Sequence, residues 1–159
     1  MALPKRRIKN RAFSLIELII VVVIIGIIAA IAIPRMSRGA AGAADSSLMG
    51  SLAVMRSGLD IYATEHGGKF PVFATFVDQM TLFTDYNGAT NVAKGGAFIY
   101  GPYLRKVPPL PVGDERGSTG ITDTAGTAGS GWVYKDTAGT IIANTLLEAD
   151  EGGKPYNTY

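Results

Sequence analysis

Residues 13–33 read FSLIELIIVVVIIGIIAAIAI, and this stretch decides how the chain is organised. It contains one charged side chain, Glu17, and the part from Leu18 to Ile33 contains none. As an α-helix, 21 residues would rise about 31 Å, which is enough to cross the hydrocarbon core of a bilayer. The stretch therefore predicts a membrane-spanning helix rather than a buried helix of a soluble core.

The charges on either side of this stretch predict its orientation. Residues 1–12 hold five basic residues and no acidic one, and Arg35 and Arg38 follow the apolar run. Since an excess of positive charge stays on the cytoplasmic side of a membrane, the N-terminus is expected in the cytoplasm. Everything beyond Pro34 should then be translocated.

The rest of the composition excludes several classes of function. The chain has 159 residues and a net charge of +2, yet beyond residue 12 it has ten basic and thirteen acidic residues. A nucleic-acid-binding protein would spread its basic residues over a folded face. The absence of cysteine and the single histidine, His66, exclude disulfides, thiol nucleophiles and multi-histidine metal sites. The sequence also lacks a phosphate loop and a nucleophile motif, so an enzyme is not predicted.

A cleaved secretory signal is the alternative to a membrane anchor. Ala30-Ile31-Ala32 has the A-x-A form of a signal-peptidase site, and cleavage after Ala32 would release a secreted binding module. However, the apolar run exceeds the usual length of about 7–15 residues, and an acidic residue inside it is costly. The residues alone favour the anchor and leave the cleaved signal open.

The segment from Lys9 to Leu18, KNRAFSLIEL, resembles the class III signal of type IV pilins and type II secretion pseudopilins. The resemblance implies that a prepilin peptidase cleaves between Ala12 and Phe13 on the cytoplasmic side and that Phe13 is then N-methylated. One position departs from the family pattern, because Ala12 stands where members almost always have glycine.

The same resemblance implies roles in assembly for three residues of the apolar helix. Glu17 occupies the acidic position of the family, where the carboxylate pairs with the N-terminal amine of a neighbouring subunit. Gly26 and Pro34 fall at the family's glycine and helix-bending proline, between which related filaments can lose helicity. Independently of the family, Gly26 and Ala30 form a small-x-x-x-small pair that allows helices to approach closely.

A second helical segment is predicted after Pro34, although Gly39 and Gly42 make its beginning a poor helix. Apolar residues then recur at spacings of three and four, so they share one helical face that needs a sheet to cover it. These residues are Leu48, Leu52, Met55, Leu59 and Tyr62. Gly67-Gly68 ends the helix, and His66 in its last turn has no expected role as a ligand.

The expected domain organisation follows from these segments. Residues 1–12 form a basic leader, 13–34 a transmembrane and assembly helix, 35–66 its amphipathic continuation, and 67–159 a loop-rich head. The resulting prediction is an α+β protein with the pilin fold, in which the long N-terminal helix packs on a small antiparallel β-sheet.

Within the head, the clearest element is a hairpin of residues 131–135 and 140–144. Trp132 and Tyr134 share one face of it and are expected to cover the helix rather than form a binding platform. A short helix is predicted from Thr75 to about Phe83, with Thr75 and Asp78 in capping-box positions. Residues 113–131 are expected to form an exposed loop.

The acidic end of the chain is a candidate metal site. Glu148, Asp150 and Glu151 lie within four residues, and G-type pseudopilins bind calcium in a late loop. This chain lacks their Asp-Pro-Trp segment after Gly101-Pro102-Tyr103-Leu104. The prediction is a solvated acidic tail and no cofactor, with Asp150 and Glu151 as the residues that would bind calcium.

The predicted function is structural: a pilus or pseudopilus subunit of a type IV pilus or a type II secretion system. The expected partners are other copies of the chain, prepilin peptidase and an inner-membrane assembly platform. The expected location is the bacterial inner membrane, with a single span, a cytoplasmic N-terminus and a periplasmic head, and then the filament.

Overall fold

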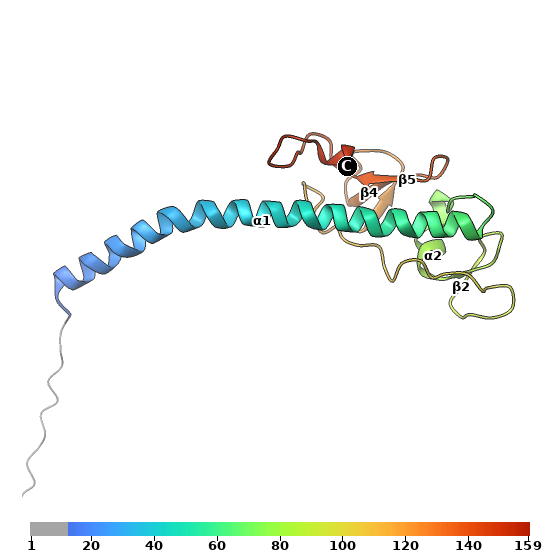
Figure 1. Cartoon of the computed structure of the whole chain (residues 1–159), viewed down its shortest axis with the longest axis horizontal. Helices are drawn as coiled ribbons and strands as arrows, with labels where there is room; N and C mark the ends of the chain where they lie inside the picture. Colours follow the sequence, from blue (N-terminus) through green and yellow to red (C-terminus); the bar gives the residue numbers. More distant parts are fainter. Residues whose placement is uncertain (1–12) are drawn as a thin grey trace, which may run out of the picture. The chain divides into compact units, whose positions relative to one another are not determined.

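The computed structural model describes residues 13–159, and of Pro34, Ser37 and Arg38 it describes the backbone alone (Figure 1). The predicted leader and Ala12 lie outside the described residues. The helices are α1 (Leu15–Glu65), α2 (Phe76–Thr81) and the short 3-10 helices η1 (Phe73–Thr75) and η2 (Tyr156–Thr158). The strands are β1 (Phe83–Thr84), β2 (Thr90–Asn91), β3 (Gly120–Thr122), β4 (Ser130–Lys135) and β5 (Thr140–Ala143).

The chain divides into two compact units, the first ending at Gly39 and the second running from Ala40 to Tyr159. Helix α1 contributes to both units, and its helical hydrogen-bonding pattern continues through Pro34, Gly39 and Gly42. The sequence predicted a weak stretch here, since each glycine costs about 1 kcal/mol in a helix. Adding residues to an existing helix is far easier than starting a new one, which accounts for the continuity.

The core of the second unit is built on the predicted apolar face of α1. All five residues of this face, from Leu48 to Tyr62, are buried and belong to the main hydrophobic cluster. Trp132 and Tyr134 of β4 are fully buried in the same cluster, which confirms that they cover the helix. The Trp132 indole donates a hydrogen bond to the Pro108 carbonyl at 2.8 Å, so its polar atom is satisfied inside the core.

Helix α1 ends one residue before His66, close to the predicted position. Gly67 has a φ of 66°, a left-handed conformation that glycine adopts without strain. The amide of Gly68 then donates to the Ala63 carbonyl at 2.7 Å, as in a Schellman motif. This turn carries the chain away from the helix and into the head.

The main sheet has the order β3-β4-β5. The predicted hairpin is confirmed, because β4 and β5 pair antiparallel with Trp132 opposite Ala143. Strand β3, however, pairs parallel with β4, so the sheet is mixed and the expectation of one exposed loop over 113–131 was wrong in its centre. Gly131 permits this pairing, since a Cβ there would lie 2.2 Å from the Ser118 carbonyl oxygen.

The smaller elements lie between α1 and this sheet in the sequence. Strands β1 and β2 form an antiparallel pair around the turn predicted at Asp85–Gly88, where the Asp85 carboxylate accepts the amides of Asn87 and Ala89 at 2.9 Å. Helix α2 confirms the predicted short helix. The capping bond expected from Thr75 does not form, because 3-10 helix η1 runs directly into α2 and already occupies that position.

The acidic stretch at residues 148–151 lies at the surface, as expected, but the last residues of the chain fold back on α1. The Tyr156 hydroxyl donates to the Asp45 carboxylate at 2.8 Å, which joins residues 111 positions apart. The Arg56 guanidinium donates to the main-chain oxygens of Ile141 and Tyr159. These bonds fix the end of the chain against the helix.

The buried face of α1 predicts a clear contrast between two substitutions that remove the same kind of side chain. Leu59 is buried and should cost about 2–5 kcal/mol of unfolding free energy when changed to alanine. Ile61 is 51 % exposed on the same helix, so Ile61→Ala should cost less than about 0.5 kcal/mol. Denaturation in detergent can be followed by the fluorescence of Trp132, the single tryptophan. Equal losses in the two variants would contradict this assignment of the core.

Candidate functional site

The N-terminal turn of α1 holds two of the predicted functional residues. Phe13 is exposed and precedes the helix, whose first bond is donated by the Leu18 amide to the Ser14 carbonyl at 3.2 Å. Glu17 is exposed in the first turn, where the partial positive charge of the helix N-terminus favours a carboxylate. Ser14 and Glu17 also have capping-box spacing, which is a further sequence signal for the start of the helix.

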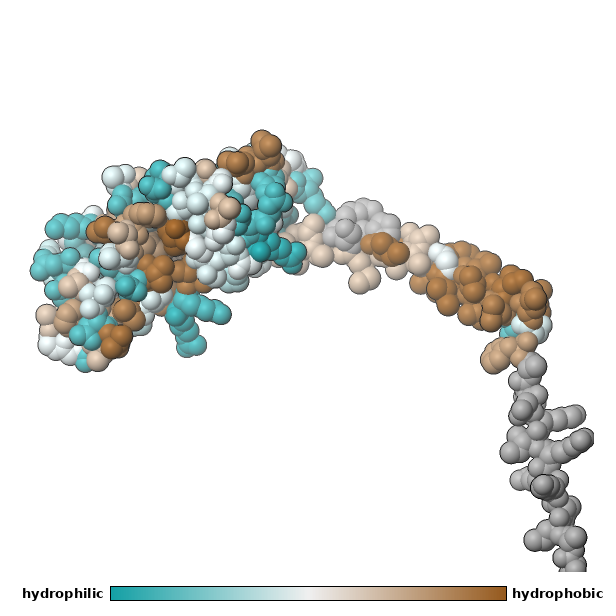
Figure 2. Space-filling model, turned by 180° about the vertical axis from the view of Figure 1, so that it is seen from behind, coloured by the Kyte–Doolittle hydropathy of each residue, from teal (hydrophilic) through white to brown (hydrophobic). Residues whose placement is uncertain are grey.

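The apolar stretch of α1 from Leu15 to Ile33 is 19 residues long, and none of it is buried within the chain. On the face drawn in Figure 2 this stretch is mostly hydrophobic, whereas the second unit is a mosaic of polar and apolar areas. By length and composition this helix is able to cross a membrane. Soluble monomers rarely expose so large an apolar surface, so this one marks a membrane or protein contact.

The environment of Gly26 differs from that of a glycine used inside the fold. A Cβ at Gly26 would meet nothing within 4 Å. A Cβ at Gly58, on the head part of α1, would lie 3.0 Å from Met80 and 3.5 Å from Leu104. Internal packing therefore explains Gly58, while no contact in the described part of the chain explains Gly26.

Pro34 lies inside α1, where it has no amide hydrogen to donate to the carbonyl of Ala30. The backbone is nevertheless helical on both sides. Together with Phe13, Glu17 and Gly26, it belongs to the first unit, apart from the acidic residues of the head. Glu17, Gly26 and Pro34 thus lie on α1, whereas the predicted calcium residues lie in the segment between β5 and η2.

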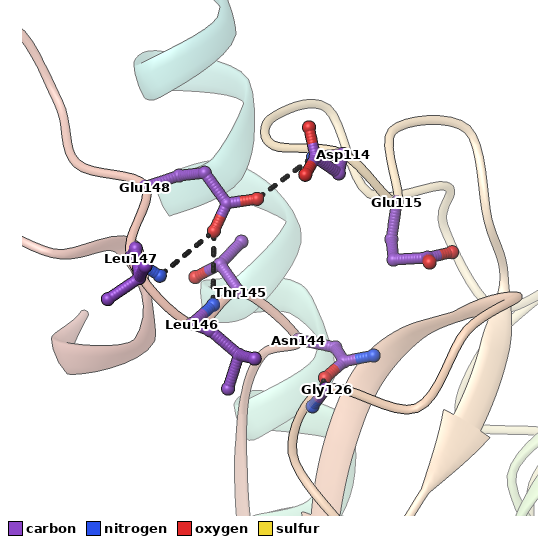
Figure 3. Close-up of a pocket in the computed structure, with 8 residues that line it drawn as sticks. All are labelled: Asp114, Glu115, Gly126, Asn144, Thr145, Leu146, Leu147 and Glu148. Carbon is purple, nitrogen blue, oxygen red and sulfur yellow. Dashed lines mark hydrogen bonds between the residues drawn. The ribbon is translucent and has the colours of Figure 1, made fainter.

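A cavity of about 300 Å³ in the head is lined by residues 114–115 and 144–148 and by Gly126 (Figure 3). The Glu148 carboxylate organises one wall of this cavity. It accepts the amides of Asp114, Leu146 and Leu147 at 3.1, 3.0 and 3.2 Å. These donors, the Asp114 amide first among them, lower the pKa of Glu148 below its ordinary value. The role of Glu148 was missed in the sequence because its donors come from two separate loops.

The two calcium candidates lie at the end of the chain. Asp150 accepts hydrogen bonds from the Tyr159 hydroxyl and from the Lys154 amide, the latter at 2.8 Å. The Tyr159 hydroxyl, followed by the Lys154 amide, lowers the pKa of Asp150. Glu151 is exposed. Within residues 13–159 the structure contains no group of three or more histidine, cysteine or acidic residues arranged to hold a metal ion.

His66 is buried at the end of α1 rather than placed in a site. Its ring stacks on Tyr62 with a centroid distance of 3.8 Å, and Nδ1 lies 2.8 Å from the Tyr62 carbonyl oxygen. The rings of Tyr100 and Tyr103 also lie near the His66 ring, with centroid distances of 5.4 and 6.2 Å. The side chain therefore packs as part of an aromatic cluster that joins the helix end to the loop after β2.

Comparison with known proteins identifies the N-terminal segment. Residues 7–33 match the model of the prokaryotic N-terminal methylation motif. No curated protein and no solved structure matches the chain. The motif is the class III signal of the type IV pilin and pseudopilin family, which confirms the resemblance noted in the sequence. The pseudopilin G features of the C-terminal part have no such support.

The motif defines the class of protein to which this signal belongs. It implies a pilin-like protein that is processed by a prepilin peptidase, and the family consists of structural rather than enzymatic proteins. The long apolar helix followed by short helices and small sheets is the α+β arrangement of a pilin fold. The signal and the helix together indicate the inner membrane.

The lowered pKa of Glu148 predicts how the stability of the head depends on pH. Because the folded-state pKa lies below the ordinary value of 4.5, the carboxylate stabilises the head above that pH, and this contribution is lost as the pH falls through the folded-state pKa. Glu148→Gln should therefore lower stability at neutral pH by about 1 kcal/mol, or roughly 4–8 °C in Tm, and flatten the acid side of the profile. Exposed Glu151 offers the control, since a Glu151→Gln profile should follow the unmodified protein. Superimposable profiles for Glu148→Gln and the unmodified chain would disprove the role of Glu148.

Proposed function

We propose that this protein is a structural subunit of a pilus or pseudopilus, of the type IV pilin or type II secretion kind, which polymerises through the apolar part of α1. The observation that carries the proposal is the match of residues 7–33 to the methylation motif directly before and within a 19-residue apolar helix, which nothing in residues 13–159 buries. A bilayer accommodates this helix before assembly, and the same helices of other subunits accommodate it in the filament.

In this proposal, prepilin peptidase cleaves between Ala12 and Phe13 and methylates the new N-terminus. Residues 13–34 then anchor and assemble the subunit, 35–66 continue the helix into the head, and 67–159 complete the head. The N-terminus faces the cytoplasm and the head faces the periplasm, as the basic leader favours. The partners are other copies of the chain, the peptidase and an inner-membrane assembly platform.

Glu17 supplies the specific contact in this scheme. Cleavage creates a positively charged amine at Phe13, four residues before Glu17. A carboxylate buried among apolar helices is strongly destabilised unless a cation pairs with it. The amine of a neighbouring subunit provides that cation, so burial of the apolar helix in the filament becomes coupled to one axial register.

Gly26 and Ala30 supply close contact between helices. Both are exposed on α1, and the space around Gly26 is open. A glycine that costs about 1 kcal/mol in a helix and serves no internal contact is accounted for by packing against another subunit. Pro34 ends this assembly segment, where the missing amide weakens the helix locally.

The first prediction of this proposal concerns processing. The mature N-terminus should be Phe13, carrying one methyl group, and the mass of the chain should fall by that of residues 1–12. N-terminal sequencing and intact mass spectrometry of the membrane fraction measure both. Restoring the family's glycine with Ala12→Gly should leave the cleavage position unchanged. A mature N-terminus at Ile33 would instead establish the secreted binding module and exclude the filament.

The second prediction concerns Glu17. Glu17→Ala should insert in the membrane to the same extent as the unmodified protein, because it removes a charge from an apolar helix. Filament yield should fall at least tenfold, since loss of a buried ion-pair partner leaves the neighbouring amine unpaired. Asp78→Ala, which removes an exposed carboxylate from α2, is the matched control and should assemble normally. Sheared filaments quantified by immunoblot provide the readout, and a normal yield from Glu17→Ala would exclude the pairing.

A further inference from the structure

Two hollows in the second unit carry opposite charge. The cavity of Figure 3 is lined by Asp114, Glu115 and Glu148 and by no basic residue. A second hollow, of about 610 Å³, lies between α1 and residues 103–108 and is lined by Arg105 and Lys106 and by no acidic residue. The two hollows share no lining residue, so one head presents both surfaces at once.

The acidic surface also presents an apolar projection. Leu147 is 94 % exposed and Leu146 is 59 % exposed, in the loop that follows β5. This loop is held in place, because the amides of both leucines donate to Glu148 and the preceding Asn144 and Thr145 are buried. The leucine pair is therefore a fixed projection with acidic side chains beside it.

The second hollow is a groove with an apolar floor and basic residues at its edge, so it complements the leucine pair and the acidic residues beside it. On the α1 side it is lined by Ser47, Gly50, Ser51 and Val54, whose small side chains leave a recess. A Cβ at Gly50 would meet nothing within 4 Å, and Val54 is 59 % exposed. Leu104 and Pro108 line the opposite side, with the exposed Arg105 and Lys106 beside them.

We propose that the Leu146–Leu147 loop of one head docks into the groove between α1 and residues 103–108 of a second copy of this chain. The leucines would fill the apolar recess, while Asp114 and Glu115 would face Arg105 and Lys106. This proposal rests on the proposed filament function and identifies the surfaces through which neighbouring heads would contact each other. Apolar fit provides the contact, and the opposite charges set its orientation.

The occupant of the groove is a second copy because the complementary halves lie on the same chain. The two surfaces are different, so the contact is heterologous: each head uses its leucine loop on one neighbour and its groove on another. A heterologous contact that does not close into a ring adds subunits without limit and forms a helical polymer. This is the geometry that a filament subunit requires.

Paired cysteines test the contact directly, because the chain has no cysteine of its own. The full chain carrying Leu147→Cys and Val54→Cys, assembled into filaments and treated with copper phenanthroline, should give a ladder of disulfide-linked multimers on a non-reducing gel. Each single variant should give no ladder. Ile61 is 51 % exposed on the same helix but outside the groove, so Leu147→Cys with Ile61→Cys is the matched control and should also give none.

Charge reversal provides an independent test. Asp114 and Lys106 are both exposed, and Asp114 is used because the carboxylates of Glu115 and Glu148 already accept hydrogen bonds within the head. Asp114→Lys and Lys106→Glu should each lower filament yield about fivefold, and the double variant should recover most of it. Failure of the double variant to recover would overturn the pairing of these surfaces.

The outcomes separate this contact from the proposed function. Filaments that form normally but give no ladder from the Leu147–Val54 pair would overturn the docking contact and leave the filament function intact. A disulfide or cross-link to a protein of different mass would overturn it in favour of another partner. If the unmodified chain forms no filaments when expressed with its assembly machinery, the filament function fails, and the contact between heads fails with it.

Discussion

The free energy of exposing the apolar part of α1 to water is the constraint on which the rest of the protein depends. Burying one large aliphatic side chain is worth about 1.5–3 kcal/mol, and the stretch from Leu15 to Ile33 consists almost entirely of such residues, all unburied within the chain. The total exceeds the roughly 5–15 kcal/mol by which a whole domain is normally stable. An apolar surface of this size is strongly unfavourable in water, which indicates that lipid or another protein covers this part of α1.

Beyond Ala40, α1 packs within the chain and forms part of the core of the head. There the apolar residues form one face rather than the whole circumference, and Leu48, Leu52 and Met55 bury it under β4 and β5. The opposite side of α1 stays open to solvent, as the exposed Val54 and Ile61 show. The apolar residues therefore change from covering the whole circumference of α1 to forming a single stripe at the point where α1 begins to pack against the head. In the proposed filament, Glu17 and the N-terminal amine of a neighbouring subunit would pair within the first part, where water no longer screens a charge.

The sequence predicted those parts of the fold that depend on local periodicity. The three-four spacing of the α1 stripe, the glycines after His66 and the alternation around Trp132 each act within a few residues, and all three were confirmed. Strand β3 was missed, because its three residues, Gly-Ile-Thr, are too few to show a strand pattern and become a strand only by parallel pairing with β4. The folded-back tail was missed for a similar reason: the bond between Tyr156 and Asp45 joins residues 111 positions apart. The proposed assembly residues remain a prediction from the motif, whereas the hydrogen bonds of Glu148 depend on loops that meet only in the folded head.

The glycines of α1 differ in whether packing within the chain requires them. Gly58 is required by the head, because a side chain there would press on Met80 and Leu104. At Gly26 and Gly50 the space beyond the backbone is open, so neither residue is needed by the fold of a single chain. Each nevertheless lowers the intrinsic stability of the helix by about 1 kcal/mol. In the proposed filament, such a cost is offset where another subunit packs against the bare backbone, once at the apolar helix and once at the head groove. Two contacts at separate points on α1 would then fix both the axial rise and the rotation between subunits, whereas a single contact at the apolar helix would leave the heads free to rotate.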